Sequence, residues 1–297
     1  MAAPATAQRH APTAVRRVDT RSATLRAIYI IWYRDVIRYW RDRLRLVASL
    51  AQPLLFLIVF GTGLSSALKG AFGGVAGASG SAGINYVQFI YPGIIGMAVL
   101  FTSIFSAMSI VWDREFGFLK EVLVAPIDRS AIAIGKTLGG STQAMVQGLI
   151  LLVLAPFIGV TLTPLAVLEL IPLIFVLAFA LTALGVALAT GMKSMQGFQA
   201  VMNFLMMPIF FLSGALFPLN NLPGWMTVLT RLDPAGYGID PLRRVILGAS
   251  GVPAALTERL GMTIGGEVLS LLAEVGLVLL FGAVMLLISI RTLRRPA

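Results

Sequence analysis

Gly135-Lys136-Thr137 is a short run with the residue types of a nucleotide-binding element, because a phosphate-binding loop ends in Gly-Lys-Thr or Gly-Lys-Ser. That loop also needs a glycine five residues before its last glycine, where this chain has Ser130. It should follow a buried strand, yet Ala131–Ile134 leads directly into a long apolar run. We therefore predict no nucleotide site in this chain, and we interpret Lys136 as a basic anchor at the cytoplasmic end of a membrane span.

Acid–base and metal chemistry have few candidate residues. The sequence has no cysteine, and its one histidine, His10, lies in a tail without a rigid scaffold. Glu169 lies near the external mouth of the apolar run Leu165–Thr190, and Glu274 lies about two turns into the apolar run Val268–Ile290. A carboxylate inside the membrane is a candidate proton or cation relay, but Glu274 has no second acid or histidine near it in sequence, which favours a structural or pore-lining role. We expect this chain to bind no metal and no cofactor.

Amides and methionines inside the apolar runs could contact a ligand. Gln143 and Gln147 are four residues apart and share one face of a helix. Asn203 has Met202 and Met206 close to it in sequence. Amides in lipid mostly form hydrogen bonds across helices, and methionines adapt to irregular packing. Packing is the simpler interpretation for each residue, while the mixed amide, Met and Phe surface would suit a bulky amphipathic substrate.

The elements that position these residues are membrane helices. The chain has 297 residues, of which 58% are hydrophobic and 12% are charged, whereas soluble domains are about 45–50% apolar and about 25% charged. A span needs about 20 apolar residues. The sequence therefore predicts an all-α membrane protein with six spans: Leu46–Leu64, Phe89–Val111, Leu138–Val160, Leu165–Thr190, Ala200–Pro218 and Val268–Ile290.

The basic residues predict the orientation of the spans. With the N-terminus inside, 18 of the 23 Lys and Arg residues lie in cytoplasmic segments. This asymmetry predicts that both termini are cytoplasmic. The net charge of +10 does not indicate a nucleic-acid partner, because the basic residues lie at the ends of apolar runs rather than in one binding patch.

Two further elements flank or interrupt the spans. A flexible tail, residues 1–24, precedes residues 25–45, where apolar side chains recur at three- and four-residue steps. This pattern predicts an amphipathic helix in the membrane interface, with its arginines toward anionic head groups. A helix packed on a partner protein is the alternative, and both can hold. The arginines of its polar face are Arg34, Arg38, Arg41 and Arg45.

The region after this helix divides into a six-span domain, residues 46–290, and a basic cytoplasmic tail, residues 291–297. The long external loop Asn220–Gly266 contains two apolar pieces, Leu222–Leu229 and Leu242–Leu247, that are too short to span. Turn-forming residues such as Asp233-Pro234 and Gly236 separate the pieces. We predict that they are external re-entrant half-helices, whose irregular backbone must be covered by protein or water.

The segment Asp113–Lys136 joins the second and third spans. Its first part alternates basic and acidic residues around an apolar stripe, and Pro126 ends the pattern. A short amphipathic helix with mixed charges on the cytoplasmic side suits docking to a soluble partner. A plain connecting helix is the alternative.

The run Arg114-Glu115-x-Gly117-x-x-x-Glu121-x-x-x-x-Pro126-Ile127, followed by Gly135-Lys136, resembles the cytoplasmic motif of type-2 ATP-binding-cassette (ABC) exporter permeases. This motif and several further matching blocks are each weak evidence alone, but together they cover most of Gln88–Gly248 in family order. Position 233 is Asp where the family often has Asn. The resemblance is nearest to the bacterial drug-resistance and lipo-oligosaccharide exporters, including daunorubicin-type permeases. The other matching blocks are Tyr91-Pro92-Gly93, Phe211-Leu212-Ser213-Gly214, Phe217-Pro218, Leu222-Pro223-x-Trp225, Asp233-Pro234 and Arg243.

The resemblance implies a permease in the bacterial inner membrane that forms a dimer, either of two identical copies or of two different chains. Each copy would pair with a separate ATPase subunit that binds ATP and Mg²⁺. Residues 25–45 would be the connecting helix, and a coupling helix seated in the ATPase would contain Glu115, Gly117, Glu121 and Pro126.

In relatives the second and fifth spans line the path of the substrate. The resemblance therefore implies four candidate lining residues, Phe101, Phe105, Asn203 and Met206. The expected cargo is an amphipathic drug, lipid or glycolipid-like molecule that is moved out of the cell. A proton- or cation-coupled secondary carrier that uses Glu274 is the alternative.

Glu121→Arg should abolish ATP-driven export while leaving membrane insertion intact, because a coupling helix transmits closure of the ATPase only while it stays docked. ATP-dependent uptake into inverted vesicles that contain the partner ATPase measures the effect. Normal transport by a correctly inserted variant would contradict the prediction.

Overall fold

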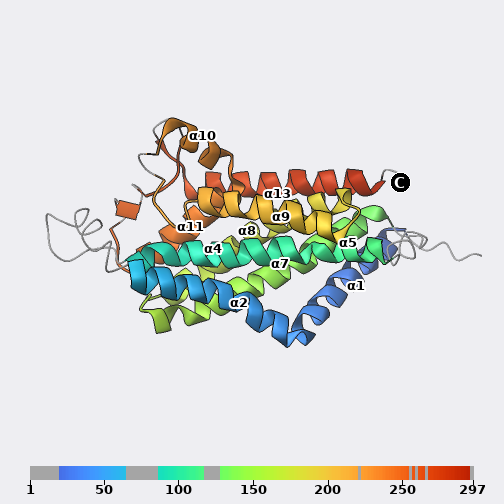
Figure 1. Ribbon diagram of the computed structural model, residues 1–297, viewed down its shortest axis with the longest axis horizontal. Helices are drawn as coiled ribbons and strands as arrows, with labels where there is room; N and C mark the ends of the chain where they lie inside the picture. Colours follow the sequence, from blue (N-terminus) through green and yellow to red (C-terminus); the bar gives the residue numbers. More distant parts are fainter. Residues whose placement is uncertain are drawn as a thin grey trace, which may run out of the picture.

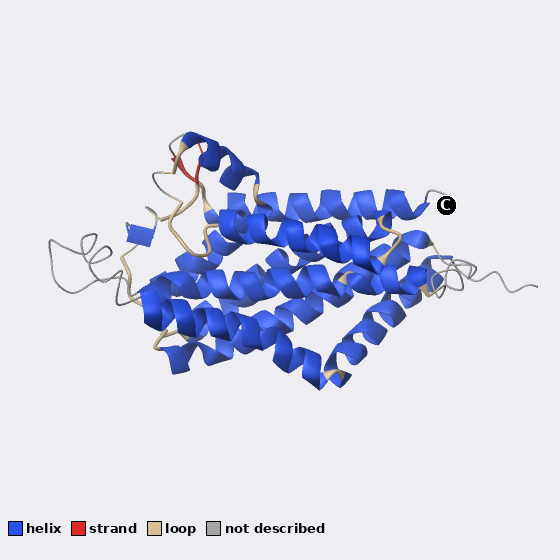
Figure 2. Cartoon of the chain, viewed as in Figure 1, coloured by secondary structure: helices blue, strands red, loops and turns tan. Residues whose placement is uncertain are grey.

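The computed structural model describes residues 20–64, 86–116, 128–219, 222–253, 256–257, 260–264 and 267–294. Among these residues the chain is helical apart from loops and one antiparallel pair, β1 (Thr263–Ile264) and β2 (Glu267–Val268), in which Thr263 lies opposite Val268. Figure 2 shows how small this pair is beside the helices. Six helices in the described part are long and apolar enough to cross a membrane. The predicted all-α, six-span fold is confirmed, and the chain is a multi-pass membrane protein.

The spans run side by side along the long axis of the molecule (Figure 1). The C-terminus marks one end of the bundle, the C-terminal end, and α11 lies at the other, the α11 end. A helix α1 (Thr20–Arg41) precedes the spans, and α10 (Gly224–Leu232) and α11 (Pro234–Ala249) lie between the last two. The spans are α2 (Arg43–Ile58) with the π-helical turn η1 (Val59–Leu64), α4 (Tyr86–Ser106) with α5 (Met108–Glu115), α7 (Arg129–Leu154) with the 3₁₀ turn η2 (Ala155–Ile158), α8 (Pro164–Gly191), α9 (Met195–Leu212) and α13 (Leu271–Arg294).

Polar caps set helix boundaries that hydropathy alone misplaces. The helix predicted over residues 25–45 ends at Arg41, because the Asp42 side chain accepts a hydrogen bond from the backbone N–H of Arg45 at 3.1 Å and starts α2. The third span begins at Arg129 rather than near Leu138. There the Asp128 side chain accepts from the backbone N–H of Ser130 at 3.0 Å. Gly135-Lys136-Thr137 therefore lies inside a helix.

The last two spans are shifted in the same way. Ser194 caps α9, which runs from Met195 to Leu212 rather than from Ala200 to Pro218. Gly214, at φ +70°, then reverses the chain in a left-handed conformation that glycine adopts without strain. The sixth helix extends to Arg294, so part of the predicted basic tail is helical.

The external pieces also differ from the prediction. The helix α11 begins at Pro234 and includes Gly236, because Asp233 accepts from the backbone N–H of Ala235 at 3.0 Å and proline suits the first helical position. Most of α11 is buried against α4, α8 and α13. By contrast, α10 leaves Trp225 and Leu232 exposed. Whether these helices enter the outer leaflet stays a prediction.

The core centres on α4 and α8, which pack on each other and on α7 and α11. Every residue from Phe89 to Leu100 is buried. Tyr91 donates a hydrogen bond to the carbonyl of Leu151 in α7. Gly93 lies against the backbone of Ala215, and a Cβ atom at this position would collide with it. The tyrosine and the glycine of the Tyr91-Pro92-Gly93 block thus hold α4 against two neighbours.

Gly93→Ala should destabilise the protein, because backbone atoms of residue 215 cannot rotate away as a side chain can. Overpacking of this kind costs about 1–3 kcal/mol, and each kcal/mol lowers the Tm of a large domain by about 2–4 °C. Thermal unfolding in detergent micelles measures the change. Gly276→Ala is the matched control, since nothing lies within 4 Å of its added Cβ. Equal Tm values for the two variants would contradict the packing argument.

Asp233 gives a pH-dependent contribution to stability. Burial raises the pKa of its carboxyl from 3.8 to about 8, although the Ala235 N–H hydrogen bond opposes this shift. The folded state therefore binds a proton that the unfolded state loses, and stability should fall as pH rises from about 4 to about 8. Asp233→Asn keeps the cap without the charge.

We expect Asp233→Asn to match the parent below about pH 4 and to exceed its Tm above pH 8 by at least about 2–4 °C. Asp233→Ala should be less stable than Asp233→Asn at every pH, because it loses a helix cap worth about 1 kcal/mol. Thermal unfolding across this pH range tests both variants. Parallel pH curves for the parent and Asp233→Asn would show that the carboxyl does not titrate in this range.

Candidate functional site

Three consecutive charged residues at the end of α5, which we name the α5 junction, each contact a different part of the bundle. These residues are Asp113, Arg114 and Glu115, and only Phe116 separates them from residues 117–127. Asp113 Oδ2 lies 3.1 Å from Lys136 Nζ in α7 and 3.2 Å from Arg34 Nη2 in α1. The first residue of the junction thus ties α5 to two helices.

The next two residues bind helix ends. Arg114 donates hydrogen bonds to the carbonyls of Thr190 at 2.9 Å and Met192 at 2.6 Å, where α8 ends. Glu115 Oε2 accepts from the backbone N–H of Met195 at 3.0 Å, where α9 begins. A cation at a helix C-terminus and an anion at an N-terminus both complement the helix dipole. The α5 junction therefore contacts α1, α7, α8 and α9.

Lys136 corrects the interpretation from the sequence. It is not an anchor that faces the head groups, because its side chain is only 4% exposed. Its Nζ lies 3.3 Å from Asp35 Oδ2 in α1 and 2.9 Å from Ser109 Oγ in α5, in addition to Asp113. A buried ammonium requires such partners. Hydropathy does not reveal these contacts, since the partners are far apart in the sequence.

A signal for Asp35 was nevertheless present. It falls three residues after Trp32 and four before Tyr39, on the inward face of α1. Trp32 Nε1 donates to Thr142 Oγ1 at 3.0 Å, and the Tyr39 hydroxyl donates to Gln147 Oε1 at 3.0 Å. An acid at the spacing of an apolar stripe predicts a buried basic partner. The helix α1 therefore packs on α7 with this face, while other aromatic residues of α1 stay exposed, among them Tyr29, Tyr33 and Trp40.

The two residues that follow 117–127 also contact another helix, α13. Asp128 forms an exposed ion pair with Arg294 of α13, 3.4 Å from Oδ2 to Nη2. The hydrogen bond from the Ser130 backbone N–H holds the pKa of the Asp128 carboxyl below its ordinary value. Arg129 donates to the carbonyl of Leu293 at 2.9 Å. The predicted coupling residues Gly117, Glu121 and Pro126 lie outside the described residues, and their role stays a prediction.

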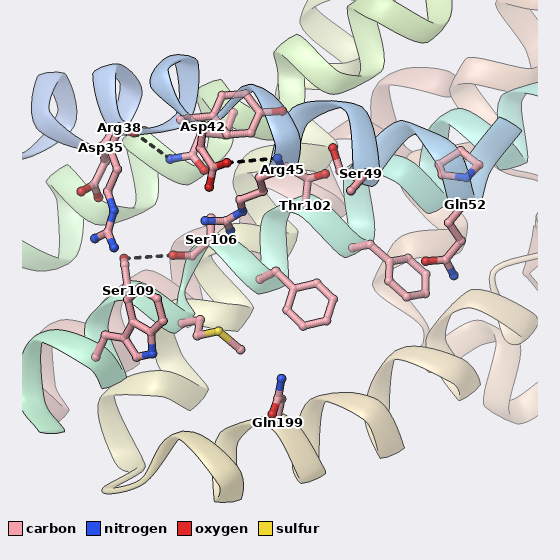
Figure 3. Close-up of a pocket in the computed structure, with 18 of the residues that line it drawn as sticks. Asp35, Arg38, Asp42, Arg45, Ser49, Gln52, Thr102, Ser106, Ser109 and Gln199 are labelled. Carbon is pink, nitrogen blue, oxygen red and sulfur yellow. Dashed lines mark hydrogen bonds between the residues drawn. The ribbon is translucent and has the colours of Figure 1, made fainter.

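A cavity of about 540 Å³ lies beside the α5 junction, between the elbow of α1 and α2, the helices α4 and α5, and α9. In Figure 3 the charged residues Asp35, Arg38, Asp42 and Arg45 gather toward one end, Gln52 lies at the other, and Gln199 faces them from α9. The remaining lining residues are Tyr39, Ala48, Ser49, Pro53, Met97, Phe101, Thr102, Phe105, Ser106, Met108, Ser109, Trp112 and Gln143.

The cavity contains two of the four predicted path residues. Phe101 and Phe105 line it, whereas Asn203 is exposed and Met206 is buried outside it. The α9 residue that lines the cavity is Gln199, one turn before Asn203. Gln199 was not among the predicted residues. A role in transport for all four residues stays a prediction.

The predicted polar residues divide between packing and the cavity. Gln147 accepts hydrogen bonds from Tyr39 and from Ser49 Oγ, the latter at 3.1 Å. Gln143 lines the cavity and donates to the Asp35 carbonyl at 3.2 Å. Among the predicted arginines, Arg38 and Arg45 line the cavity. Arg34 forms an ion pair with Asp113 of the α5 junction, and Arg41 is exposed.

Glu274 lies in the first turn of α13, not two turns into the span, because that helix begins at Leu271. Its side chain is fully buried, and Oε1 is 2.9 Å from Arg244 Nη2, which also lies 2.7 Å from Asp240 Oδ2 in α11. This arrangement holds α11 against α13 at the α11 end. Glu169 is exposed near the start of α8.

This chain is similar to proteins named as transport permeases and to a nodulation protein. The chain is 30% identical over 221 residues to a ycf38 transport permease of Cyanophora paradoxa, and this alignment covers 74% of the chain and 73% of that protein. It is 28% identical over 236 residues to the inner membrane transport permease YadH of Escherichia coli strain K12, with coverage of 78% and 87%. Nodulation protein J of Rhizobium meliloti strain 1021 is 26% identical over 229 residues, with coverage of 76% and 83%.

A family model agrees with this similarity and with the arrangement of the spans. The model described as ABC-2 type transporter matches residues 26–247, which extend from α1 through most of α11. Members of this family are membrane permease subunits that lack an ATPase site of their own and work with an ATPase. This chain belongs to the ABC-2 type transporter family.

Proposed function

We propose that the chain is the permease subunit of an ATP-driven exporter in the bacterial inner membrane. A separate ATPase, which binds ATP and Mg²⁺, docks on residues 117–127. The C-terminal end of the bundle, with both termini, faces the cytoplasm. This orientation agrees with the excess of Lys and Arg in the segments at that end. A second identical copy completes the translocation path.

The α5 junction is the observation that carries this proposal. Residues 117–127 are the point where the partner acts, and the residues on either side of them contact α1, α7, α8, α9 and α13. A displacement of this segment therefore reaches five helices through charged contacts rather than through one flexible linker. ATP binding to the partner shifts the population between two arrangements of the bundle.

The cargo of this exporter is amphipathic. The cavity combines Phe101, Phe105 and Met97 with charged residues at its other end. Binding sites for small molecules commonly have volumes of about 300–1,000 Å³ and are lined by apolar side chains with a few polar groups. Drug-like, lipid and glycolipid-like molecules all meet this description.

The carrier alternative has less support. A proton relay needs ionisable groups near the middle of the membrane. Glu274 lies instead at the start of its helix and is paired with Arg244. Its position explains the packing of α11 without a transport step.

The test is transport by the purified chain reconstituted with its ATPase. ATP should drive uptake of an amphipathic probe into vesicles in which the C-terminal end faces outward, and a proton gradient alone should not. Glu115→Gln should lower the rate by about tenfold, because it keeps an acceptor for the Met195 N–H but loses the charge that makes this hydrogen bond about twice as strong as a neutral one. Binding of the ATPase should remain.

Glu169→Gln is the matched control, because it removes one exposed acid at the other end of the bundle. It should leave transport unchanged. Transport that follows a proton gradient and ignores ATP would overturn the exporter proposal. Unchanged transport by Glu115→Gln would instead overturn the role of the α5 junction.

A further inference from the structure

The cavity beside the α5 junction is divided along its length. Arg38 and Arg45 lie at its charged end (Figure 3). Trp112 belongs to α5, which lies nearer to the C-terminal end of the bundle than α4, the helix of Met97 and Phe101 (Figure 1). From Met97 to Trp112 the helices α4 and α5 rise about 22 Å at 1.5 Å per residue. One leaflet of a bilayer with its head groups is about 20–22 Å thick. The cavity thus extends over the depth of one leaflet.

The charged end of the cavity has two guanidinium groups that no acid neutralises directly. Among the described residues, the ion pairs at this end involve Arg34, Lys136, Asp35 and Asp113, and no carboxylate lies within 4.0 Å of Arg38 or Arg45. The Arg38 guanidinium lies over the Trp112 ring, 5.2 Å from its centre. Cation–π contact positions the charge without cancelling it.

The two acids that line the same end are already engaged. Asp35 is neutralised by Lys136, with Nζ 3.3 Å from Oδ2. Asp42 caps α2 through the backbone N–H of Arg45, where the helix dipole favours a negative charge. An incoming anion would therefore meet two available arginines and two occupied carboxylates. Guanidinium groups match the geometry of phosphate oxygens.

We propose that this cavity binds an anionic amphiphile from the inner leaflet, with a phosphate head group held by Arg38 and Arg45 and an apolar chain along Phe101, Phe105 and Met97. This proposal rests on the proposed function, which sets the C-terminal end in the cytoplasm. It selects anionic lipid-like molecules over cationic drugs as the substrate class.

Competitive native mass spectrometry on the full chain in detergent micelles tests the proposal. The probes are 1-oleoyl-glycerol 3-phosphate and 1-oleoyl-glycerol, which share one chain, while only the first carries a phosphate and therefore a negative charge. The anionic probe should be retained at least about tenfold better, since a charge-assisted hydrogen bond contributes about 1.5–3 kcal/mol. Glycerol 3-phosphate, which lacks the chain, should not compete.

The double variant Arg38→Gln, Arg45→Gln should reduce this preference to less than about twofold. Arg26→Gln, Arg43→Gln is the matched control, because it removes the same charge from exposed arginines that do not line the cavity. Thr102→Phe fills the cavity without changing charge and should lower retention of both probes, whereas Thr292→Phe on α13, outside the cavity, should not.

Three results would overturn the proposal. These are equal retention of the two probes by the parent chain, an equal loss of preference in the control double variant, and competition by glycerol 3-phosphate as strong as that by the anionic lipid. No ATP or ATPase is present in this measurement. Its failure therefore leaves ATP-driven export standing, and a failure of export leaves the binding result intact.

Discussion

The buried ammonium of Lys136 organises the C-terminal end of the bundle. It lies between Asp35 of α1 and Asp113 of α5, and its own helix is α7. Moving a charge out of water costs several kcal/mol unless partners with good geometry replace the water. Removing one partner of such a group typically costs about 3–5 kcal/mol. The three helices must therefore keep one arrangement near this point, and this arrangement fixes the position of the α5 junction.

The α11 end follows the same rule with other residues. Arg243 is 2% exposed, donates to the carbonyl of Gly214, and lies 4.5 Å from the centre of the Phe89 ring. Arg244 forms ion pairs with both Asp240 and Glu274. Both ends of the core are thus fixed by buried charges, while α2 and α9 are buried over only a small part of their length. The span α13 is also little buried, but only α2 and α9 of these three spans border the cavity, together with the well-buried α4.

The sequence predicted the number and class of the spans, because hydropathy depends on composition within one segment. It misplaced helix starts at Asp128 and Ser194, where one side chain bonded to a backbone N–H decides the boundary. It also placed Lys136 and Glu274 in the right segments with the wrong surroundings, since their partners come from other helices. Phe101 and Phe105 of the cavity were predicted through the family resemblance, and Gln143, Arg38 and Arg45 were singled out by helical spacing without a prediction that they share one cavity. Gln199 required the packed structure, whereas the spacing of Asp35 from Trp32 and Tyr39 already indicated a buried acid.

The cavity and the α5 junction share residues, and this has a thermodynamic consequence. Asp35, Ser109 and Gln143 line the cavity. Asp35 and Ser109 bind Lys136, which binds Asp113, while Gln143 donates to the backbone of Asp35. An anion near Arg38 changes the electrostatic balance at Asp35, and a displacement of α5 changes the same contacts from the other side. Coupling between two binding sites is reciprocal, so a ligand that favours one arrangement of this network would also change the affinity for the ATPase proposed to dock on residues 117–127. Because both sites act on one set of ion pairs, this coupling needs no conformational change that passes through the apolar core.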